Sequence, residues 1–368
     1  TYGVWPDELS ELPYEIPYAN IWDEVLVSFG SRSHRRLQRP YARIDGPQLS
    51  SAFFELLRSR DALRCGRVSE VRFSSPYFSV QVSKFDVLKA RFVIDATGHE
   101  PRFLHRPMGS PAFQTAVGKR VVSGEGGGTL GERTMGLMLW DNGLEIEQQG
   151  RLIPAFLYVM PVSCEVYFAE LTILAARPSV PIGALQVVLD DWLRRRGMKE
   201  VERGAGEERV FIPMGHPLPD LEQPMIGIGG AASQVHPATG YMFARSLRTA
   251  ERLADAVAEA RNETAVQARA ALWRAVWPEQ EVRSRAVYEL GLEAVLGMGA
   301  AQTRDFFQCF FDLPDPLWRG YLAGSLHGGE LAEAMWMLFR DVPIALKMEL
   351  ARTAIGRRTP EIVRALRG

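Results

Sequence analysis

The strongest candidate for acid–base chemistry in this sequence is a glutamate placed among apolar residues. The segment 165–174 alternates as a strand does, which puts Glu170 on one face with Val166, Phe168 and Thr172. Apolar surroundings disfavour the ionised form of a carboxyl group, so we expect a raised pKa for Glu170 and a bound proton near neutral pH. Glu170 is therefore a candidate general acid. The alternative is a glutamate of an edge strand that faces water.

A glycine-rich junction at 226–246 is the main candidate for a ligand site. In I-G-I-G-G-A-A-S-Q-V-H-P-A-T-G-Y-M-F-A-R-S, a short apolar strand runs into a glycine turn, a polar loop and the start of a long helix. Glycines permit a close approach, and the N–H groups of a helix start attract a pyrophosphate or the edge of a flavin. The candidate cofactor-binding residues here are Gly227, Gly229, Gly230, Ala231, Pro237 and Gly240. The alternative is an ordinary strand–loop–helix junction. His236 is a candidate base, with a structural role in the loop as its alternative.

A second strand end carries a related signal. The run R-F-V-I-D-A-T-G-H predicts a buried strand whose end holds Asp95, Thr97 and Gly98. This A-T-G turn resembles flavoproteins of the glutathione-reductase type, in which the strand end leads the chain past the nucleotide. Flavin hydroxylases carry a G-D-A-A…P-x-x-G segment similar to the junction, and Gly230 stands where their aspartate holds the flavin ribose.

Aromatic residues form a third group. Phe306 and Phe310, like Phe307 and Phe311, are one helical turn apart, a spacing that usually means core packing. Aromatic rings that line a cavity would also stabilise a cation, by about 0.5–2 kcal/mol per contact. The whole set is Trp140, Tyr158, Tyr167, Phe168, Phe306, Phe307, Phe310, Phe311, Trp318 and Tyr321.

Periodicity divides the chain into a mixed α/β part up to about residue 248 and a helical part beyond it. Residues 1–32 predict loops and short helices, and residues 101–131 predict a loop-rich connection with a glycine run at 124–128. The predicted strands lie near 41–45, 67–94 (a hairpin and a buried strand), 135–140, 155–160, 165–174 and 226–228. The predicted helices cover 47–60, 182–196 and 245–261, and helices continue from 264 with breaks near Pro278, 297–299, 314–316 and Pro343.

Composition narrows the function classes. The chain has 368 residues, 46% apolar and 24% charged, which is typical of a globular protein of one large or two medium domains. A net charge of −1 gives no field that favours nucleic acid as a partner. Cys65, Cys164 and Cys309 lie far apart, so neither a disulfide framework nor a metal site is predicted, and a reducing compartment fits. Because no run of 18 apolar residues occurs, we expect no spanning helix.

Eight ordered segments together resemble one family. They are Y-G-V-W-P-D-E-L, V-I-D-A-T-G-H, F-Q-T-A-V-G, F-L-Y-V-M-P, F-A-E-L-T-I-L-A-A-R-P, F-I-P-M-G-H-P-L-P, G-I-G-G-A-A-S-Q-V-H-P-A-T-G-Y and F-F-Q-C-F-F-D-L-P…W-R-G-Y-L. Over residues 1–343 they look like the lycopene cyclases of cyanobacteria, algae and plants, most of all the β-cyclases.

The resemblance implies an α/β fold of the Rossmann-like, FAD/NAD(P)-binding type found in glutathione reductase and the aromatic hydroxylases. The expected division is a remainder of the FAD-binding domain (1–100), a β-rich substrate-binding subdomain (101–222), a second FAD-contacting segment and helix (223–262) and a C-terminal helical region (263–368). Thr1 falls where the family's first βαβ unit, with G-x-G-x-x-G, has already ended. We therefore expect an N-terminally incomplete cyclase that holds flavin poorly.

The resemblance also implies a reaction without net redox change. Reduced FAD, kept reduced by NAD(P)H, assists while a carboxylic acid protonates C2 of a linear lycopene end group; the C5=C6 bond attacks C1, and the C5 cation loses a proton. The family's F-L-E-E-T segment carries an essential glutamate, which matches Glu170, and its second glutamate is Leu171 here. The family's D-W-R is Leu139-Trp140-Asp141, so Trp140 and Asp141 are further catalytic candidates. The substrate-binding candidates are Phe168, Met214, His216 (the second glycine of the family's I-P-M-G-G), His236 and Phe310.

The expected partners are lycopene or a related carotenoid and a membrane surface met peripherally through Trp336, Met337 and Phe339, with other carotenoid enzymes as further partners. The expected location is a plastid membrane or a cyanobacterial membrane surface. Three alternatives stay open: a lycopene ε-cyclase or a relative such as neoxanthin or capsanthin–capsorubin synthase, an FAD-dependent aromatic hydroxylase, and an inactive carotenoid-binding relative. Consumption of NAD(P)H in step with product would distinguish the hydroxylase.

Overall fold

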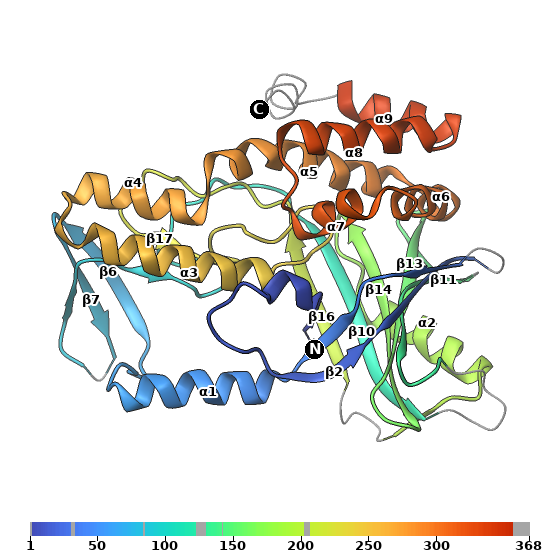
Figure 1. Ribbon diagram of the computed structural model, residues 1–368, viewed down its shortest axis with the longest axis horizontal. Helices are drawn as coiled ribbons and strands as arrows, with labels where there is room; N and C mark the ends of the chain where they lie inside the picture. Colours follow the sequence, from blue (N-terminus) through green and yellow to red (C-terminus); the bar gives the residue numbers. More distant parts are fainter. Residues whose placement is uncertain are drawn as a thin grey trace.

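A large mixed sheet occupies one half of the molecule (Figure 1). The structure, a computed structural model, describes residues 2–30, 34–83, 85–122, 130–141, 143–201 and 207–355. Within them nine strands join in the order β15-β10-β14-β13-β11-β3-β4, with β16 beside β10 and β12 beside β13. In this sheet only one described pair of neighbours, β11 and β3, runs parallel. The strands are β3 (Glu24–Phe29), β4 (His34–Leu37), β10 (Ala112–Val122), β11 (Thr134–Trp140), β12 (Glu145–Gln148), β13 (Arg151–Pro161), β14 (Val166–Ala176), β15 (Lys199–Glu200) and β16 (Glu208–Met214).

Helix α2 (Ile182–Arg195) covers one face of this sheet. Its apolar positions recur at helical spacing, so Leu185, Leu189 and Trp192 pack against strand residues such as Val117 and Leu171. This half of the core therefore takes one set of alternate residues from β10, β13 and β14. The other set faces the opposite side, where the site lies.

Two short parallel strands organise the other half of the molecule. β9 (Ile94–Asp95) pairs with β17 (Ile226–Gly227), and the chain continues from β17 through a loop into α3 (Phe243–Glu259) and α4 (Ala265–Val276). The remaining elements of this half are the antiparallel sheet of β6 (Val68–Ser74), β7 (Tyr77–Val82) and β8 (Leu88–Ala90), the sheet of β1 (Gly3–Val4), β5 (Tyr41–Ile44) and β2 (Tyr18–Trp22), the short 3-10 helices Pro6–Leu9 and Ala260–Asn262, and α1 (Gly46–Ser59).

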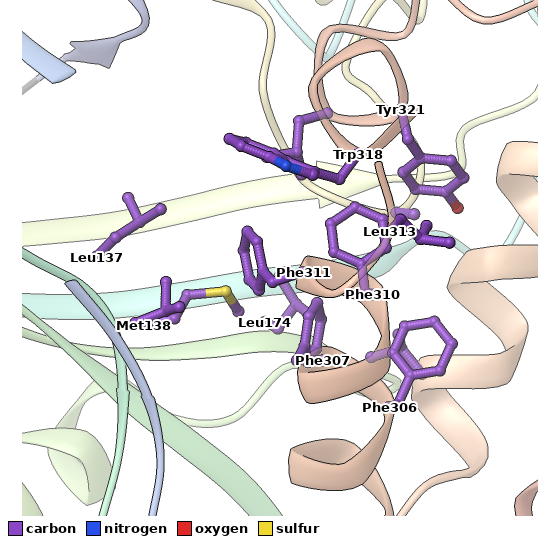
Figure 2. Close-up of a cluster of buried hydrophobic side chains, with 14 of the residues drawn as sticks. Leu137, Met138, Leu174, Phe306, Phe307, Phe310, Phe311, Leu313, Trp318 and Tyr321 are labelled. Carbon is purple, nitrogen blue, oxygen red and sulfur yellow. The ribbon is translucent and has the colours of Figure 1, made fainter. Parts of the chain in front are cut away.

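The C-terminal helices pack on the sheet face that α2 leaves open. Figure 2 shows their core, in which Phe307 and Phe311 of α6 meet Met138 and Leu174 of the sheet. Prolines and glycines break the helices where the sequence predicted, for example at Pro278 before α5. The helices are α5 (Glu279–Gly297), α6 (Ala300–Phe311), α7 (Asp315–Ala323), α8 (Gly328–Asp341) and α9 (Ile344–Ile355).

Two predicted segments are wrong. Residues 1–32, predicted as loops and short helices, do contain a short 3-10 helix at Pro6–Leu9, but β1, β2 and β3 were missed. Residues 101–131, predicted as loop-rich, contain the eleven-residue strand β10. Because both faces of β10 are covered, its burial does not alternate and the period-two signal is lost. The glycine run 124–128 and the end of the predicted helical region, 356–368, lie outside the described residues.

The predicted domain ranges stay a prediction, with one difference in strand membership. β3 and β4 belong to the first range, 1–100, yet they lie in the large sheet with strands of the second range. Among the described helices none is long and apolar enough to span a bilayer. The three cysteines are free thiols.

Candidate active site

A cavity of about 600 Å³ lies between the large sheet, the ends of β9 and β17, and α7. Its floor is one face of four neighbouring strands, β16, β10, β14 and β13, because every second residue of a strand points to the same side. The alternate floor residues are Val210, Ile212, Gln114, Ala116, Phe168, Glu170, Thr172, Tyr158 and Met160. The sequence alternation correctly placed Phe168, Glu170 and Thr172 on one face.

Glu170 stands in the middle of this floor. β14 lies between β10 and β13, so the edge-strand alternative is wrong. The hydroxyl of Thr172 donates a hydrogen bond to Glu170 Oε1 at 3.0 Å. Burial, and then the negative charge of Glu208, raise the pKa of Glu170 from 4.5 to about 7, against the effect of the Thr172 bond. A large share of the molecules therefore carries a proton on Glu170 at neutral pH.

Tyrosines and a tryptophan form an aromatic wall next to Glu170. The hydroxyls of Tyr41 and Tyr158 interact with that of Tyr241, and the ring of Tyr41 meets that of Trp5 edge to face with centroids 4.8 Å apart. All four residues line the cavity. The sequence pointed to Tyr158 but missed Trp5, Tyr41 and Tyr241. Trp5 and Tyr41 come from N-terminal segments that carry little periodic signal.

The ends of β9 and β17 meet at another side of the cavity. A Cβ atom added to Gly230 would lie 2.9 Å from the backbone N of His99, so only glycine allows the two turns to touch. Arg106 holds the turns together, since its guanidinium donates to the carbonyl oxygens of His99 at 2.6 Å and Gly230 at 3.4 Å. The sequence predicted that these two segments share one site, and the structure brings them together.

Only some of the predicted cofactor residues of these segments reach the cavity. Gly98, Gly230 and Gly240 line the cavity. The other six lie outside the described cavity lining, on the strand ends and in the turns and loop that follow them: Asp95, Thr97, Gly227, Gly229, Ala231 and Pro237. Asp95 is buried, and its Oδ1 accepts hydrogen bonds from the backbone N–H and the hydroxyl of Thr97.

The first turn of α3 points into the same cavity. Residues 242–246 line it, and Met242 at the helix start provides no side-chain cap. Ser246 is the first residue whose N–H bonds within the helix, to Met242, so the N–H groups of residues 243–245 have no partner in the helix. Two buried oxygens, Asp95 Oδ2 and Ser246 Oγ, also have no hydrogen-bond partner among the described residues. This edge of the cavity therefore offers polar atoms to a ligand.

His236 is buried in the loop before α3 and also lines the cavity. Its Nδ1 accepts a hydrogen bond from the N–H of Ala238 at 3.3 Å, and its ring packs against Tyr288 with centroids 4.6 Å apart. Burial, and then the charges of Arg245 and Arg285, lower the pKa of His236 to about 3. A neutral imidazole of such low basicity supports the structural alternative over a catalytic base.

The structure does not bring Trp140 and Asp141 to Glu170. Trp140 is buried among Phe156 and Phe307, where α6 packs on the sheet. Asp141 directly follows the end of β11, and its carboxylate accepts a hydrogen bond from Arg196, just after α2, at 2.5 Å. Neither lines the cavity among its described residues. Their positions do not support the catalytic roles that the sequence predicted.

Three predicted substrate-binding residues also lie outside the described cavity lining. Met214 is fully buried at the end of β16, and Phe310 packs against Tyr321 in the helical core. His216 is half-buried, and burial, followed by the charge of Arg106, lowers its pKa to about 4. Their substrate contacts stay predictions without support from the geometry, whereas Phe168 and His236 do line the cavity.

The departures from the resembling family fall mostly on the far face of the sheet. Leu171 is fully buried against α2, and Leu139 packs against the same cluster. Because the side chain after Glu170 points away from the cavity, position 171 does not face Glu170 or its surroundings. A leucine there leaves the cavity floor unchanged.

The family model for lycopene cyclase protein matches residues 1–348. The chain belongs to the lycopene cyclase family. Among its relatives, the lycopene beta cyclase of Synechococcus elongatus is 34% identical, over 93% of this chain and 84% of that protein. The chloroplastic lycopene beta cyclase of Arabidopsis thaliana is 31% identical, over 95% of this chain and 72% of that protein. The chromoplastic capsanthin/capsorubin synthase of Citrus sinensis is 31% identical, over 95% of this chain and 71% of that protein.

Solved structures confirm the predicted fold class. A geranylgeranyl bacteriochlorophyll reductase-like protein from Thermoplasma acidophilum superposes with a TM-score of 0.63 at 12% identity, covering 95% of this chain and 88% of that one. A flavin-dependent brominase gives 0.54 at 13% identity, covering 87% and 81%. A halogenase in complex with phloroglucinol and FAD gives 0.51 at 11%, covering 98% and 80%. This cyclase-family chain thus has the Rossmann-like fold of FAD-dependent enzymes, with a helical C-terminal region.

The described residues fit the flavin end of FAD. The uncapped first turn of α3 can bind acceptor atoms, and Gly98 and Gly230 line the cavity with backbone that a ligand can approach closely. The buried Ser246 Oγ, which lines the cavity, offers a further polar partner. No cluster of three metal-ligand side chains occurs among the described residues.

Proposed function

We propose that the chain is a lycopene β-cyclase, which converts the linear end groups of lycopene to β-rings by acid-initiated cyclisation without net redox change. The observation that carries the proposal is the position of Glu170. It is a carboxyl group with a pKa of about 7 in the middle of an aromatic-walled cavity of about 600 Å³. An acid that holds its proton at neutral pH and faces an apolar chamber suits the protonation of a carbon–carbon double bond.

Glu170 would deliver its proton to C2 of the end group. The cation at C1 is then attacked by the C5=C6 double bond, which closes the ring and moves the positive charge to C5. Loss of a proton from a carbon next to C5 restores neutrality, and loss from C6 gives the β-ring. One proton enters and one leaves, so the product is an isomer of the substrate. Loss from C4 instead would give the ε-ring.

The aromatic wall supports the cationic steps. Trp5, Tyr41, Tyr158 and Tyr241 surround the side of the cavity next to Glu170, and the faces of such rings stabilise a cation by about 0.5–2 kcal/mol each. The apolar floor residues also exclude water, which would trap a carbocation as an alcohol. The same wall offers a polyene chain a mostly aromatic surface.

We infer that FAD, held reduced by NAD(P)H, is the cofactor. The residues that would hold it are Gly98, His99, Gly230 and the first turn of α3. When bound, reduced flavin supplies an electron-rich ring system beside the cavity. Flavin content of the protein expressed from the complete open reading frame, measured by fluorescence after denaturation, tests this assignment.

We further propose peripheral contact with a membrane, since lycopene dissolves only in lipid. Trp336 is 66% exposed on α8, and Ile344 and Met348 on α9 are 79% and 64% exposed. Met337 and Phe339 of the predicted contact are half-buried, and Met337 packs against the helical core. A plastid membrane or a cyanobacterial membrane surface fits this contact, because the relatives include chloroplastic and cyanobacterial proteins. Other carotenoid enzymes are proposed as neighbours there.

Expression in bacteria that accumulate lycopene tests the activity. The chain and the complete open reading frame that encodes it are expressed, and the carotenoids are separated by chromatography. We expect γ- and β-carotene from active protein and unchanged lycopene from Glu170→Gln. Unchanged lycopene with both forms of the wild-type protein would contradict the proposal. ε-Rings, or a keto or hydroxylated product, would replace it with one of the related activities.

A further inference from the structure

One row of residues crosses the cavity floor through Glu170. The strand register pairs Glu170 of β14 with Gly118 of β10, and Gly118 with Glu208 of β16. Register partners in antiparallel strands project to the same face. Two carboxyl groups therefore face the same side of the sheet, and the strand between them contributes a residue with no side chain.

The ring of Phe168 occupies the space above Gly118. A Cβ atom added to Gly118 would lie 2.2 Å from Phe168 Cζ, so no other residue fits under the ring. Phe168 is buried, and it places apolar atoms beside the line that joins the two carboxyl groups. Charges interact more strongly through apolar matter than through water, so this arrangement strengthens the effect of Glu208 on Glu170.

We propose that Glu208 is a positioning residue of the cyclase: its carboxylate acts across Gly118 on Glu170 and keeps the acid in its proton-carrying form. The inference rests on the proposed function, because it assigns Glu208 a role in preparing the acid of that reaction. Glu208 itself lies outside the described cavity lining, so it acts through Glu170 and not on the substrate.

Other charged groups of the described residues also lie near the row. Arg43 of β5 interacts with Glu208, and Arg120 lies two residues after Gly118 on the same face of β10, exposed to solvent. Glu8 lines the cavity but pairs with Arg39, and Arg245 pairs with Glu281. In the described part of the chain, the remaining titratable groups that face the cavity are His99, His236, Tyr2, Tyr41, Tyr158 and Tyr241. Glu208 is the charged side chain that directly opposes ionisation of Glu170, since burial and Glu208 are the two causes of its raised pKa.

The experiment is a pH titration of Glu170 by infrared difference spectroscopy, with Glu170→Gln identifying its carboxyl band. In Glu208→Gln we expect the midpoint to fall by about one pH unit, whereas Glu208→Asp restores most of the shift. Thr172→Val moves the midpoint upward, because it removes a hydrogen bond to the charged form. Glu207→Gln is the matched control. Glu207 accepts a hydrogen bond from Gln186 of α2 on the far face of the sheet, so this substitution should leave the midpoint of Glu170 unchanged.

An unchanged midpoint in Glu208→Gln overturns the inference. If Glu208→Gln does not fold, Glu208→Met replaces it, because methionine is also uncharged and of similar length. The same fall in the midpoint of Glu170 is expected. The titration needs no turnover, so it reports on Glu208 even if the chain forms no rings. Where the enzyme is active, the upper limb of its pH–rate profile falls at lower pH in Glu208→Gln by the same interval. A merely structural role would reduce the rate at every pH.

Discussion

The chemistry of Glu170 comes from its surroundings. The same side chain on an exposed strand would be fully ionised at neutral pH, but here an apolar floor, a hydrogen bond from Thr172 and a carboxylate two strands away set its proton affinity. The sequence predicted the first of these from the alternation of residues 165–174. It could not predict Glu208, because only the pairing of β10 with β16 brings that residue near.

The raised pKa of Glu170 predicts a gain in stability when the group is removed. Glu170 titrates at about 7 in the folded state against 4.5 for the unfolded reference, so its stabilising contribution is complete below pH 4.5 and is lost as the pH rises through 7. Glu170→Gln stays neutral at every pH. At pH 9 the variant should therefore be more stable than the wild type, by on the order of 3 kcal/mol, and equally stable at pH 4.

Denaturant unfolding of both proteins at the two pH values measures this difference. The same variant should form no rings. A variant that is inactive and less stable at both pH values would mean that Glu170 has a packing role instead. Glu207→Gln is the control at pH 9. It also replaces a carboxylate by an amide, but Glu207 is paired with Arg209 and should give no gain in stability when it is replaced.

At the scale of elements, the site depends on the contact between the turns after β9 and β17. Gly230→Ala puts a methyl group 2.9 Å from the backbone of His99, and backbone atoms cannot move aside cheaply. We expect the turns to separate, with the affinity for FAD reduced about tenfold or more, equivalent to at least 1.4 kcal/mol. Titration of the apoprotein with FAD, followed by flavin fluorescence, gives the affinity.

Gly183→Ala on α2 is the matched control, since a Cβ atom there meets nothing within 4 Å. An unchanged affinity in Gly230→Ala would show that the flavin does not depend on the contact between these turns. A loss in both variants would point to general instability. The two glycines thus separate a local effect on the site from an effect on folding.

Sequence patterns predicted elements well where one face is buried and the other exposed. Helix α2 and the end of α5 at Gly297 followed from periodicity and breakers. β10 did not, because it is covered on both faces, and β2 and β3 did not, because strands of five and six residues carry only a short period-two signal. Asp141 shows the same limit: its sequence neighbour Trp140 faces the helical core, while Asp141 turns to Arg196 on α2.

At the scale of the whole molecule, the exposed apolar side chains of α8 and α9 predict a membrane-contacting surface. Trp336→Asp combined with Met348→Asp should lower binding to lipid vesicles about tenfold or more, because the loss of one buried apolar side chain costs about 1.5–3 kcal/mol. Sedimentation with vesicles of chloroplast-type galactolipids measures the binding. Val187→Asp on α2, at a side chain that is 70% exposed, is the control. Equal loss in the control would place the contact elsewhere.

The fold as a whole places the proposed cofactor-binding residues and the proton donor Glu170 around one cavity. The ends of β9 and β17 and the start of α3 form one side, the sheet carries Glu170 on the other, and the C-terminal helices fix the sheet from above (Figure 1). A protonating enzyme must give its product a proton from the acid, and that acid exchanges with solvent between turnovers. This consequence can be followed in the product itself.

The most direct test of the central claim is therefore cyclisation in heavy water. Lycopene is incubated with the active protein and reduced FAD in D2O, and the β-carotene formed is analysed by mass spectrometry and NMR. The account predicts one deuterium at C2 of each ring, and no consumption of NAD(P)H in step with product. Rings without deuterium at C2, or product formed in proportion to NAD(P)H oxidised, would contradict protonation by Glu170 as the initiating step.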